Sequence, residues 1–293
     1  MSPMSSAFPV PDPFELARRA ATVLAERTGR ARHDLFVVLG SGWAHVAELL
    51  PAGTDVPMTE LPGFPAPSAA GHGGAFRSLE VDGLRVLLAL GRVHLYEGHD
   101  PQAVAHGVRT AWAAGCATAI LTNAAGILNV DWPLGRPIVI SDHINLTGTS
   151  PLTGPNPTPP LPGRFADMSA AYTPALRALA HRVEPSLPEG VYVGFRGPQF
   201  ETPAEVRMAG LLGGSLVGMS TVLEAIAASH LHMQVLGLSL ATNLAAGLSP
   251  VPLDGDHVLA VARDNAPWVA DLLARIIRAI AGGRVAQAQQ AQQ

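Results

Sequence analysis

Arg92, His94 and Tyr96 recur at every second position of the segment 91–99. If the chain is extended there, their side chains point to one face of a strand. That face would carry a guanidinium, an imidazole and a phenol, a set that suits a phosphate-like anion beside a sugar-like polyol. A strand end with solvated polar side chains explains the same spacing, and the pattern alone leaves the two interpretations at about even odds.

Small or polar residues follow other apolar runs of strand length in the same way. The clusters lie at positions 40–42, 91–92, 122–126, 196–201, 220 and 241–243. Ligands of α/β proteins bind beyond the carboxyl ends of the strands, so this repetition favours a shared pocket. The Gly-Ser-Gly segment 40–42 is by itself more typical of a plain turn. It lacks the Lys-Ser/Thr ending of a P-loop and the third glycine of a dinucleotide fingerprint.

The elements that would position these residues alternate along the chain. Strands are predicted over 35–39, 84–90, 118–121, 137–140, 191–195, 215–219 and 235–240. Helix starts are indicated by an N-cap residue before proline at 12–13, 100–101 and 173–174, and by capping-box spacing at 202–205 and 221–224. We expect the first helix to close near Gly29, the second near Gly115, and the last to run from about Asp256 to Ala281. The alternation predicts an α/β fold with a largely parallel or mixed sheet.

Composition restricts the class of protein further. The 293 residues are 48% hydrophobic and 14% charged, which is enough to bury a core and too apolar for disorder. A net charge of −4 without a basic run argues against nucleic-acid binding, and the single Cys116 cannot form an intrachain disulfide. The chain has neither an apolar stretch of transmembrane length nor a secretory pattern at its start, so we expect a cytoplasmic protein. One domain over 12–281 is expected, with flexible tails at 1–11 and 282–293.

With these residues assembled, the chain resembles the trimeric purine nucleoside phosphorylases over residues 35–265. The matching segments are 38–42, 91–99, 122–126, 141–146, 197–208, 217–221 and 242–243. Each is modest alone, and their joint order carries the resemblance. It implies one α/β domain with a central mixed, partly barrel-like sheet flanked by helices. It also implies an enzyme of purine salvage that uses phosphate to cleave the N-glycosidic bond, releasing the purine base and (deoxy)ribose 1-phosphate.

The resemblance assigns one group of residues to the phosphate. They are Ser41, His72, Arg92, His94, the backbone N–H of Ala124, and Ser220. The planar fork of Arg92 matches two phosphate oxygens, although a structural ion pair is the alternative for this residue. Ser220 directly precedes the expected capping box, so it stands at a helix N-terminus, where dipole and free N–H groups favour an anion.

A second group is assigned to the nucleoside. It comprises Tyr96, Met219 and His257 at the pentose, Phe200, Glu201 and Asn243 at the purine, and Phe165 reaching over from a neighbouring subunit of a homotrimer. The resemblance makes Asn243, Glu201 and His94 the catalytic residues. Asn243 can donate to purine N7, where the charge of the leaving group gathers. The alternatives are core packing for Met219, a solvated His257 and a surface acid at Glu201.

Asn243 also bears on substrate choice. The methylthioadenosine phosphorylases, a sister group, have Asp at the matching position. Asn suits 6-oxopurines and a carboxylate suits 6-aminopurines, so we expect inosine and guanosine to be preferred over adenosine. Ile127 stands where the family usually has a second glycine, which leaves open a nucleoside-binding protein without catalysis. The resemblance implies no cofactor and no metal, with inorganic phosphate as co-substrate, and the histidines lack a compact ligand set such as His-Glu-x-x-His.

Overall fold

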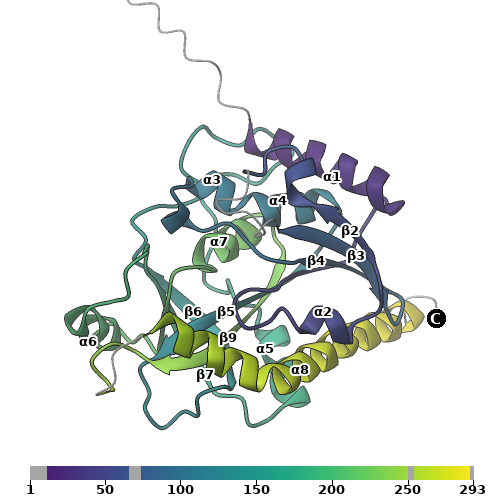
Figure 1. The fold of residues 1–293 in the computed structure, drawn as a ribbon. Coiled ribbons are helices and arrows are strands. Elements are labelled where there is room, and N and C mark those ends of the chain that lie inside the picture. Colours follow the sequence, from purple (N-terminus) through teal and green to yellow (C-terminus); the bar gives the residue numbers. More distant parts are fainter. Residues whose placement is uncertain (1–11, 66–73, 250–253, 291–293) are drawn as a thin grey trace, which may run out of the picture.

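The protein folds around one large mixed sheet with helices on both faces (Figure 1). The computed structural model describes residues 12–65, 74–249 and 254–290, without the side chains of His257 and of 284–290. The strands are β1 Leu35–Val38, β2 Thr54–Pro57, β3 Ala75–Val81, β4 Leu84–Ala89, β5 Thr118–Ile127, β6 Pro137–Asn145, β7 Glu189–Gly194, β8 Leu216–Gly218 and β9 Gln234–Leu244. The helices are α1 Pro13–Thr28, α2 Val46–Leu49, α3 Pro101–Val104, α4 His106–Ala113, α5 Pro174–Val183, α6 Pro203–Leu211, α7 Val222–His230 and α8 Gly255–Gln290, with 3-10 turns η1 Met58–Glu60 and η2 Leu95–Glu97.

The sheet closes on itself over part of its width. Its described strands follow the order β2-β3-β4-β1-β5-β8-β7-β6-β9, and β9 also pairs with β5. The strands β5, β8, β7, β6 and β9 therefore form a closed ring, and β1 to β4 extend it as an open sheet. This arrangement confirms the prediction of a mixed, partly barrel-like sheet.

Strand directions in the ring bring distant polar segments together. β5 runs parallel to β1 and β9, whereas β8 runs antiparallel to β5 and pairs Gly126 with Val217. The carboxyl-terminal parts of β5 and β8 consequently meet from opposite directions. Residues 122–126 thus lie beside the chain that leaves β8 at residues 219–221.

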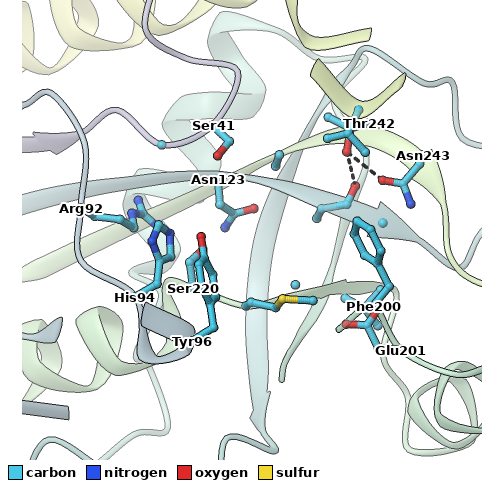
Figure 2. Close-up of a pocket in the computed structure, with 18 residues that line it drawn as sticks. Ser41, Arg92, His94, Tyr96, Asn123, Phe200, Glu201, Ser220, Thr242 and Asn243 are labelled. Atoms are coloured by element: carbon cyan, nitrogen blue, oxygen red, sulfur yellow. Dashed lines mark hydrogen bonds between the residues drawn. The ribbon is translucent and has the colours of Figure 1, made fainter. Parts of the chain in front are cut away.

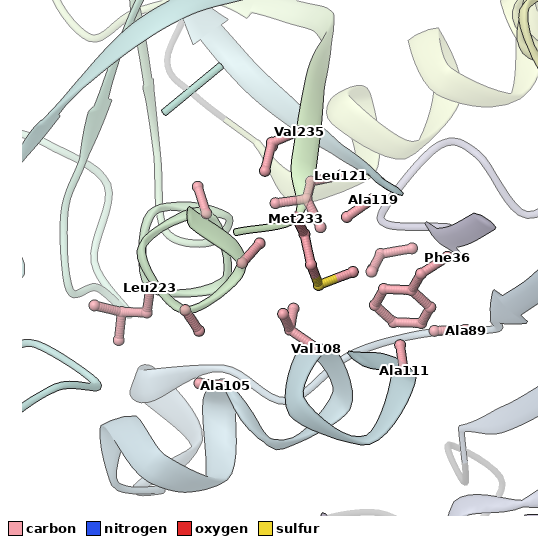
Figure 3. Packing of buried hydrophobic residues seen from close by; sticks show 14 of the residues in the cluster. Phe36, Ala89, Ala105, Val108, Ala111, Ala119, Leu121, Leu223, Met233 and Val235 are labelled. Atoms are coloured by element: carbon pink, nitrogen blue, oxygen red, sulfur yellow. The ribbon is translucent and has the colours of Figure 1, made fainter. Parts of the chain in front are cut away.

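Two layers of apolar side chains hold the helices against the sheet. Helices α1, α4 and α7 cover one side, where Val108 and Leu223 pack with Phe36 and Leu121 of the strands (Figure 3). Helices α2, α5 and α8 cover the other side, where fully buried Leu273 is part of a second cluster. Burial on both sides explains why the central strands consist of continuous apolar runs.

Local signals predicted several element boundaries correctly. Asp12 caps α1 through a hydrogen bond from the backbone N–H of Phe14 (2.9 Å), and Gly29 ends that helix with φ of 68°. The capping boxes begin α6 after Thr202 and α7 after Thr221. Among the described segments, no helix combines the length and the apolar character needed to cross a bilayer.

Other boundaries differ from the prediction. The strands β2 and β3 were not predicted, because Arg77, Ser78 and Glu80 break the apolar run of β3, and β2 is a short edge strand. The helix expected over 101–115 is two helices, with Ala105 between α3 and α4. The last helix does not end at Ala281 but continues through Gly282-Gly283 to Gln290, because Ala, Gln and Arg, which are good helix formers, predominate over 284–290.

Candidate active site

One pocket collects most of the predicted site residues (Figure 2). Its cavity volume is about 150 Å³, and it is open to solvent on one side. The predicted residues that line it are Ser41, Arg92, His94, Tyr96, Ala124, Phe200, Glu201, Met219, Ser220 and Asn243. Arg92 and His94 lie at one end of the pocket, and Asn243, Phe200 and Glu201 lie at the other.

One predicted residue lies away from this pocket, and two others are outside the described side chains. Phe165 is 95% exposed, so it does not contribute to the pocket of its own chain. His72 lies outside the described residues. His257 falls in the first turn of α8 as predicted, but its side chain is outside the described structure.

The segment that carries Arg92, His94 and Tyr96 reaches the pocket by a route that the spacing did not predict. β4 ends at Ala89, and residues 95–97 form the turn η2. The extended segment expected over 91–99 is therefore wrong, because Gly91 adopts φ of 118° and redirects the chain. The rings of His94 and Tyr96 stack, with centroids 4.6 Å apart, and both side chains line the pocket.

The polar clusters of β5 and β9 lie within the strands rather than beyond them. The two strands pair in parallel, but their register shifts so that Ala125 pairs with Ala241 and Gly126 pairs with Asn243. Thr242 is the extra residue of a β-bulge. Bulges redirect side chains next to active sites, and here both Thr242 and Asn243 line the pocket.

Arg92 is both paired and directed to the pocket. Its Nη1 donates to the hydroxyl of Thr221 (2.9 Å) and lies 3.2 Å from Oε2 of Glu224, while Nη2 donates to the carbonyl of Thr122. The side chains of Arg92 and Glu224 are only 5% and 4% exposed. Burial raises the pKa of Glu224, and Arg92 opposes that rise. Arg92 therefore forms a structural ion pair and also lines the pocket. Its Nε has no hydrogen-bond partner among the described residues.

Small hydroxyl residues surround the same end of the pocket. Gly40 precedes Ser41 and leaves no room for a Cβ, because the carbonyl of Thr122 lies against it. Ser220 stands immediately before the N-cap of α7, as predicted. Its backbone N–H donates to the hydroxyl of Tyr192 (3.3 Å), and its Oγ lies 3.1 Å from the hydroxyl oxygen of Thr221. These contacts fix Ser220 between Tyr192 and Thr221 at the wall of the pocket.

His94 is electrically neutral near pH 7. Burial, followed by the charge of Arg92, lowers the pKa of its imidazole to about 4, against a weaker raising effect of Glu97. Nδ1 of His94 lies 3.3 Å from Oε1 of Glu97. A neutral imidazole adds hydrogen bonding to the anion end without adding charge.

The opposite end of the pocket presents an amide and a carboxylate. The carboxamide oxygen of Asn243 accepts from the hydroxyl of Thr242 (2.9 Å), and one N–H donates to the carbonyl of Leu244 (2.9 Å). The second N–H of Asn243 has no partner among the described residues and can donate to a ligand. Glu201 is 7% exposed, and its Oε1 is buried without a hydrogen-bond partner in the part of the chain that the structure describes. Burial raises the pKa of Glu201, so the alternative of a surface acid is wrong.

Some pocket residues were not singled out from the sequence. Asn123 and Thr242 line the pocket, and Thr221 and Glu224 hold Arg92 from behind. The signal for Asn123 was present, since a polar pair, Thr122-Asn123, continues an apolar strand that is buried on both faces.

Ile127 is fully buried in the core and is not part of the pocket lining, which retains Ala124. Within 12–65, 74–249 and 254–290, no three metal-ligating side chains gather in one place.

The chain is similar to known purine nucleoside phosphorylases in sequence and in fold. Residues 34–278 match a family model described as the phosphorylase superfamily. A purine nucleoside phosphorylase of Cellulomonas is 53% identical over 92% of this chain and 95% of its own length. One of Mycobacterium tuberculosis is 52% identical over 92% of this chain and 98% of its own. The crystal structure of Schistosoma mansoni purine nucleoside phosphorylase with inosine superposes with a TM-score of 0.84 at 31% identity, covering 90% of this chain and 95% of that one.

Proposed function

The chain belongs to the phosphorylase superfamily and, within it, to the purine nucleoside phosphorylases, and we propose that its pocket cleaves inosine and guanosine with phosphate. The products are the free purine and (deoxy)ribose 1-phosphate. The observation that carries this proposal is that Arg92 and Asn243 lie at opposite ends of a single pocket that Tyr96 and Met219 also line.

The anion end of the pocket supports phosphate as the nucleophile. The guanidinium of Arg92, the hydroxyls of Ser41 and Ser220 and the neutral imidazole of His94 all line this end. Together they offer several donors to one dianion while only one of them is a fixed cation. A phosphate held here would attack the sugar carbon as the purine departs to the other side.

The base end supports stabilisation of the leaving group. As the glycosidic bond breaks, positive charge develops on the pentose and negative charge on the purine. Asn243 keeps one N–H free for N7, and the β-bulge and Thr242 fix the orientation of its amide before substrate arrives. Such preorganised donors act on charge that exists only in the transition state. The unpartnered Oε1 of Glu201 can accept the N1–H of a 6-oxopurine.

The substrate preference rests on the same two residues. A 6-oxopurine has an N1–H for Glu201 and an O6 acceptor, whereas a 6-aminopurine has neither. Crystal structures of the Schistosoma mansoni enzyme carry inosine in one case and adenosine in another, so binding alone does not measure preference. Turnover of inosine, guanosine and adenosine at equal concentration does, and equal rates for inosine and adenosine would contradict the proposal.

The decisive assay follows purine release from inosine with and without phosphate. Release that requires phosphate supports the phosphorylase, whereas equal release without phosphate indicates a hydrolase. Tight binding of inosine with no release indicates a binding protein. Replacement of Asn243 by Asp should lower inosine turnover by roughly 100-fold, the effect of losing one preorganised donor. An unchanged rate would refute the role of Asn243.

We include three further properties in this proposal. Phosphate serves as co-substrate and no metal or cofactor takes part, so a chelator should leave turnover unchanged. The protein acts in the cytoplasm, which its single cysteine favours. It works as a homotrimer in which Phe165 enters a neighbouring pocket, and the 95% exposure of this phenyl ring within one chain supports an external partner.

A further inference from the structure

Thr221 has the most unusual backbone conformation in the site. It is 1% exposed and adopts φ of 67° and ψ of −45° at the N-cap of α7. The backbone N–H of Val222 donates to the carbonyl of Ser220 (2.7 Å), so Thr221 is the centre of a γ-turn with a positive φ, a rare and strained form. The other non-glycine residues with positive φ in the described chain are Asp82 and His232, residue types that tolerate it better than a β-branched residue.

The hydroxyl of Thr221 is a junction between residues of the anion end. Its oxygen accepts from Nη1 of Arg92 (2.9 Å) and from Nδ2 of Asn123 (2.8 Å). It also lies 3.1 Å from Oγ of Ser220. Arg92, Asn123 and Ser220 all line the pocket, whereas Thr221 stands behind them.

The number of donors and acceptors fixes the direction of the third contact. A hydroxyl oxygen has two lone pairs and one hydrogen. With the amide nitrogen of Asn123 facing this oxygen, as in the structure, Arg92 and Asn123 both donate to Thr221, and so does the backbone N–H of Glu224 in the capping box. None of these three groups can accept, so the lone pairs of Thr221 are occupied. The hydrogen of Thr221 must then be donated to Oγ of Ser220, which leaves the hydrogen of Ser220 free for an oxygen in the pocket.

We infer that Thr221 is a positioning residue for the phosphate: its strained turn places one hydroxyl that orients Arg92 and Asn123 and directs the Ser220 hydroxyl into the pocket. This inference rests on the proposed function. Strained backbone persists where the surrounding structure over-determines it, and it clusters at functional sites. A purely structural N-cap has no need of the strain, because an N-cap residue ordinarily adopts an extended conformation, as Thr202 does at α6.

The test compares Thr221→Val, Thr221→Gly and Thr221→Ser. Val keeps the shape and removes the hydroxyl, Gly removes the hydroxyl and relieves the strain, and Ser keeps the hydroxyl. Thr173→Val is the matched control, because Thr173 is also an N-cap threonine and its hydroxyl accepts from the backbone N–H of Val235 (2.9 Å), at the far end of β9. The readouts are the thermal midpoint and the separate KM values for phosphate and inosine.

Both Val and Gly should raise the phosphate KM by about 10-fold to 100-fold, as expected for losing a hydrogen bond to a charged group. In both variants the inosine KM should change less than the phosphate KM. Thr221→Ser, which keeps the hydroxyl, should have a phosphate KM near the wild-type value. Gly should lower the thermal midpoint less than Val does, because it tolerates positive φ. Thr173→Val should lower the midpoint and leave both KM values unchanged.

An unchanged phosphate KM in a folded Gly or Val variant would overturn the inference. Equal rises of both KM values that follow the loss of thermal stability would overturn it as well. If the wild-type protein itself releases no base in a phosphate-dependent manner, the proposed function fails instead. Should Val fail to fold, the Gly variant decides, since a structural role predicts no kinetic change for it and a positioning role predicts a weaker phosphate site.

Discussion

Replacing Glu224 would measure how much the buried ion pair with Arg92 contributes to the free energy of unfolding. Its Oε2 lies 3.2 Å from Nη1 of Arg92, and it also accepts from the backbone N–H of Thr221 at 3.2 Å. The change Glu224→Gln keeps the shape of the side chain and an oxygen acceptor for that N–H, and it removes the negative charge. Arg92 would then be a buried cation without a counter-charge until an anion enters the pocket.

The expected loss is large. Two unit charges 3.2 Å apart attract each other by roughly 5 kcal/mol at an effective dielectric constant of about 20. Part of this gain offsets desolvation, and removing one partner of a buried pair costs about 3–5 kcal/mol. Without phosphate, we therefore expect Glu224→Gln to lower the free energy of unfolding by about 3–5 kcal/mol.

Urea denaturation at zero and at saturating phosphate provides the assay. Phosphate stabilises any native state that binds it, and it should stabilise the variant more than the wild type, because its charge replaces the missing carboxylate beside Arg92. The matched control is Glu80→Gln, since Glu80 pairs with Arg30 at 2.9 Å on the surface, with side chains 49% and 34% exposed. That control should lose less than about 1 kcal/mol and show no phosphate effect.

Two results would refute this reasoning. A loss below about 1 kcal/mol for Glu224→Gln would mean that the pair is no stronger than a surface pair. A loss that stays constant at every phosphate concentration would mean that phosphate and Glu224 do not act on the same cation. The second result would also remove Arg92 from the phosphate site.

Three further predictions follow from single features of the site. Phe165→Ala should leave the unfolding of one chain unchanged, since the ring is 95% exposed, but raise the inosine KM in the assembled protein; an unchanged KM would place this ring outside the site. Thr242→Val should lower inosine turnover about tenfold by freeing the Asn243 amide, whereas an unchanged turnover would show that the bulge alone orients it. His33 and His94 have pKa values lowered to about 4 in the folded protein, so the unfolded chain binds more protons below pH 6.5. The free energy of unfolding should therefore fall as pH drops from 6.5 towards 4, by about 2 kcal/mol per histidine at pH 5. A constant urea midpoint from pH 7 to 5 would contradict this.

Local chemistry made the helix boundaries predictable. Asp12-Pro13 and Gly29 define both ends of α1 through hydrogen bonds and dihedral angles of adjacent residues. The capping box that begins at Thr202 likewise defines the start of α6. The edge strand β2 and its neighbour β3 were not predicted, because exposed or half-buried polar residues interrupt the apolar run that identified the central strands.

The construction of the pocket depends on contacts that no short segment contains. The hydrogen bonds of Thr221 join it to Asn123 and Arg92, which are 98 and 129 positions away in the chain. The bulge at Thr242 exists only because β9 pairs with β5, more than a hundred residues earlier. Ten of the residues that the family resemblance supplied line the pocket, whereas the alternating spacing of Arg92, His94 and Tyr96 pointed to pocket residues through an extended strand that is not there.

The proposed phosphate site carries less positive charge than its basic residues could supply. Arg92 is already opposed by Glu224, and His94 is held neutral with a pKa of about 4. A site with two unopposed cations would bind the dianion more tightly, but it would hold phosphate and the sugar phosphate product alike. Tight binding of ground states does not accelerate the chemical step, whereas donors that act on charge formed in the transition state do. The free N–H of Asn243 is such a donor, which is why we expect its loss to reduce turnover, and the loss of the Thr221 hydroxyl to affect mainly the phosphate KM.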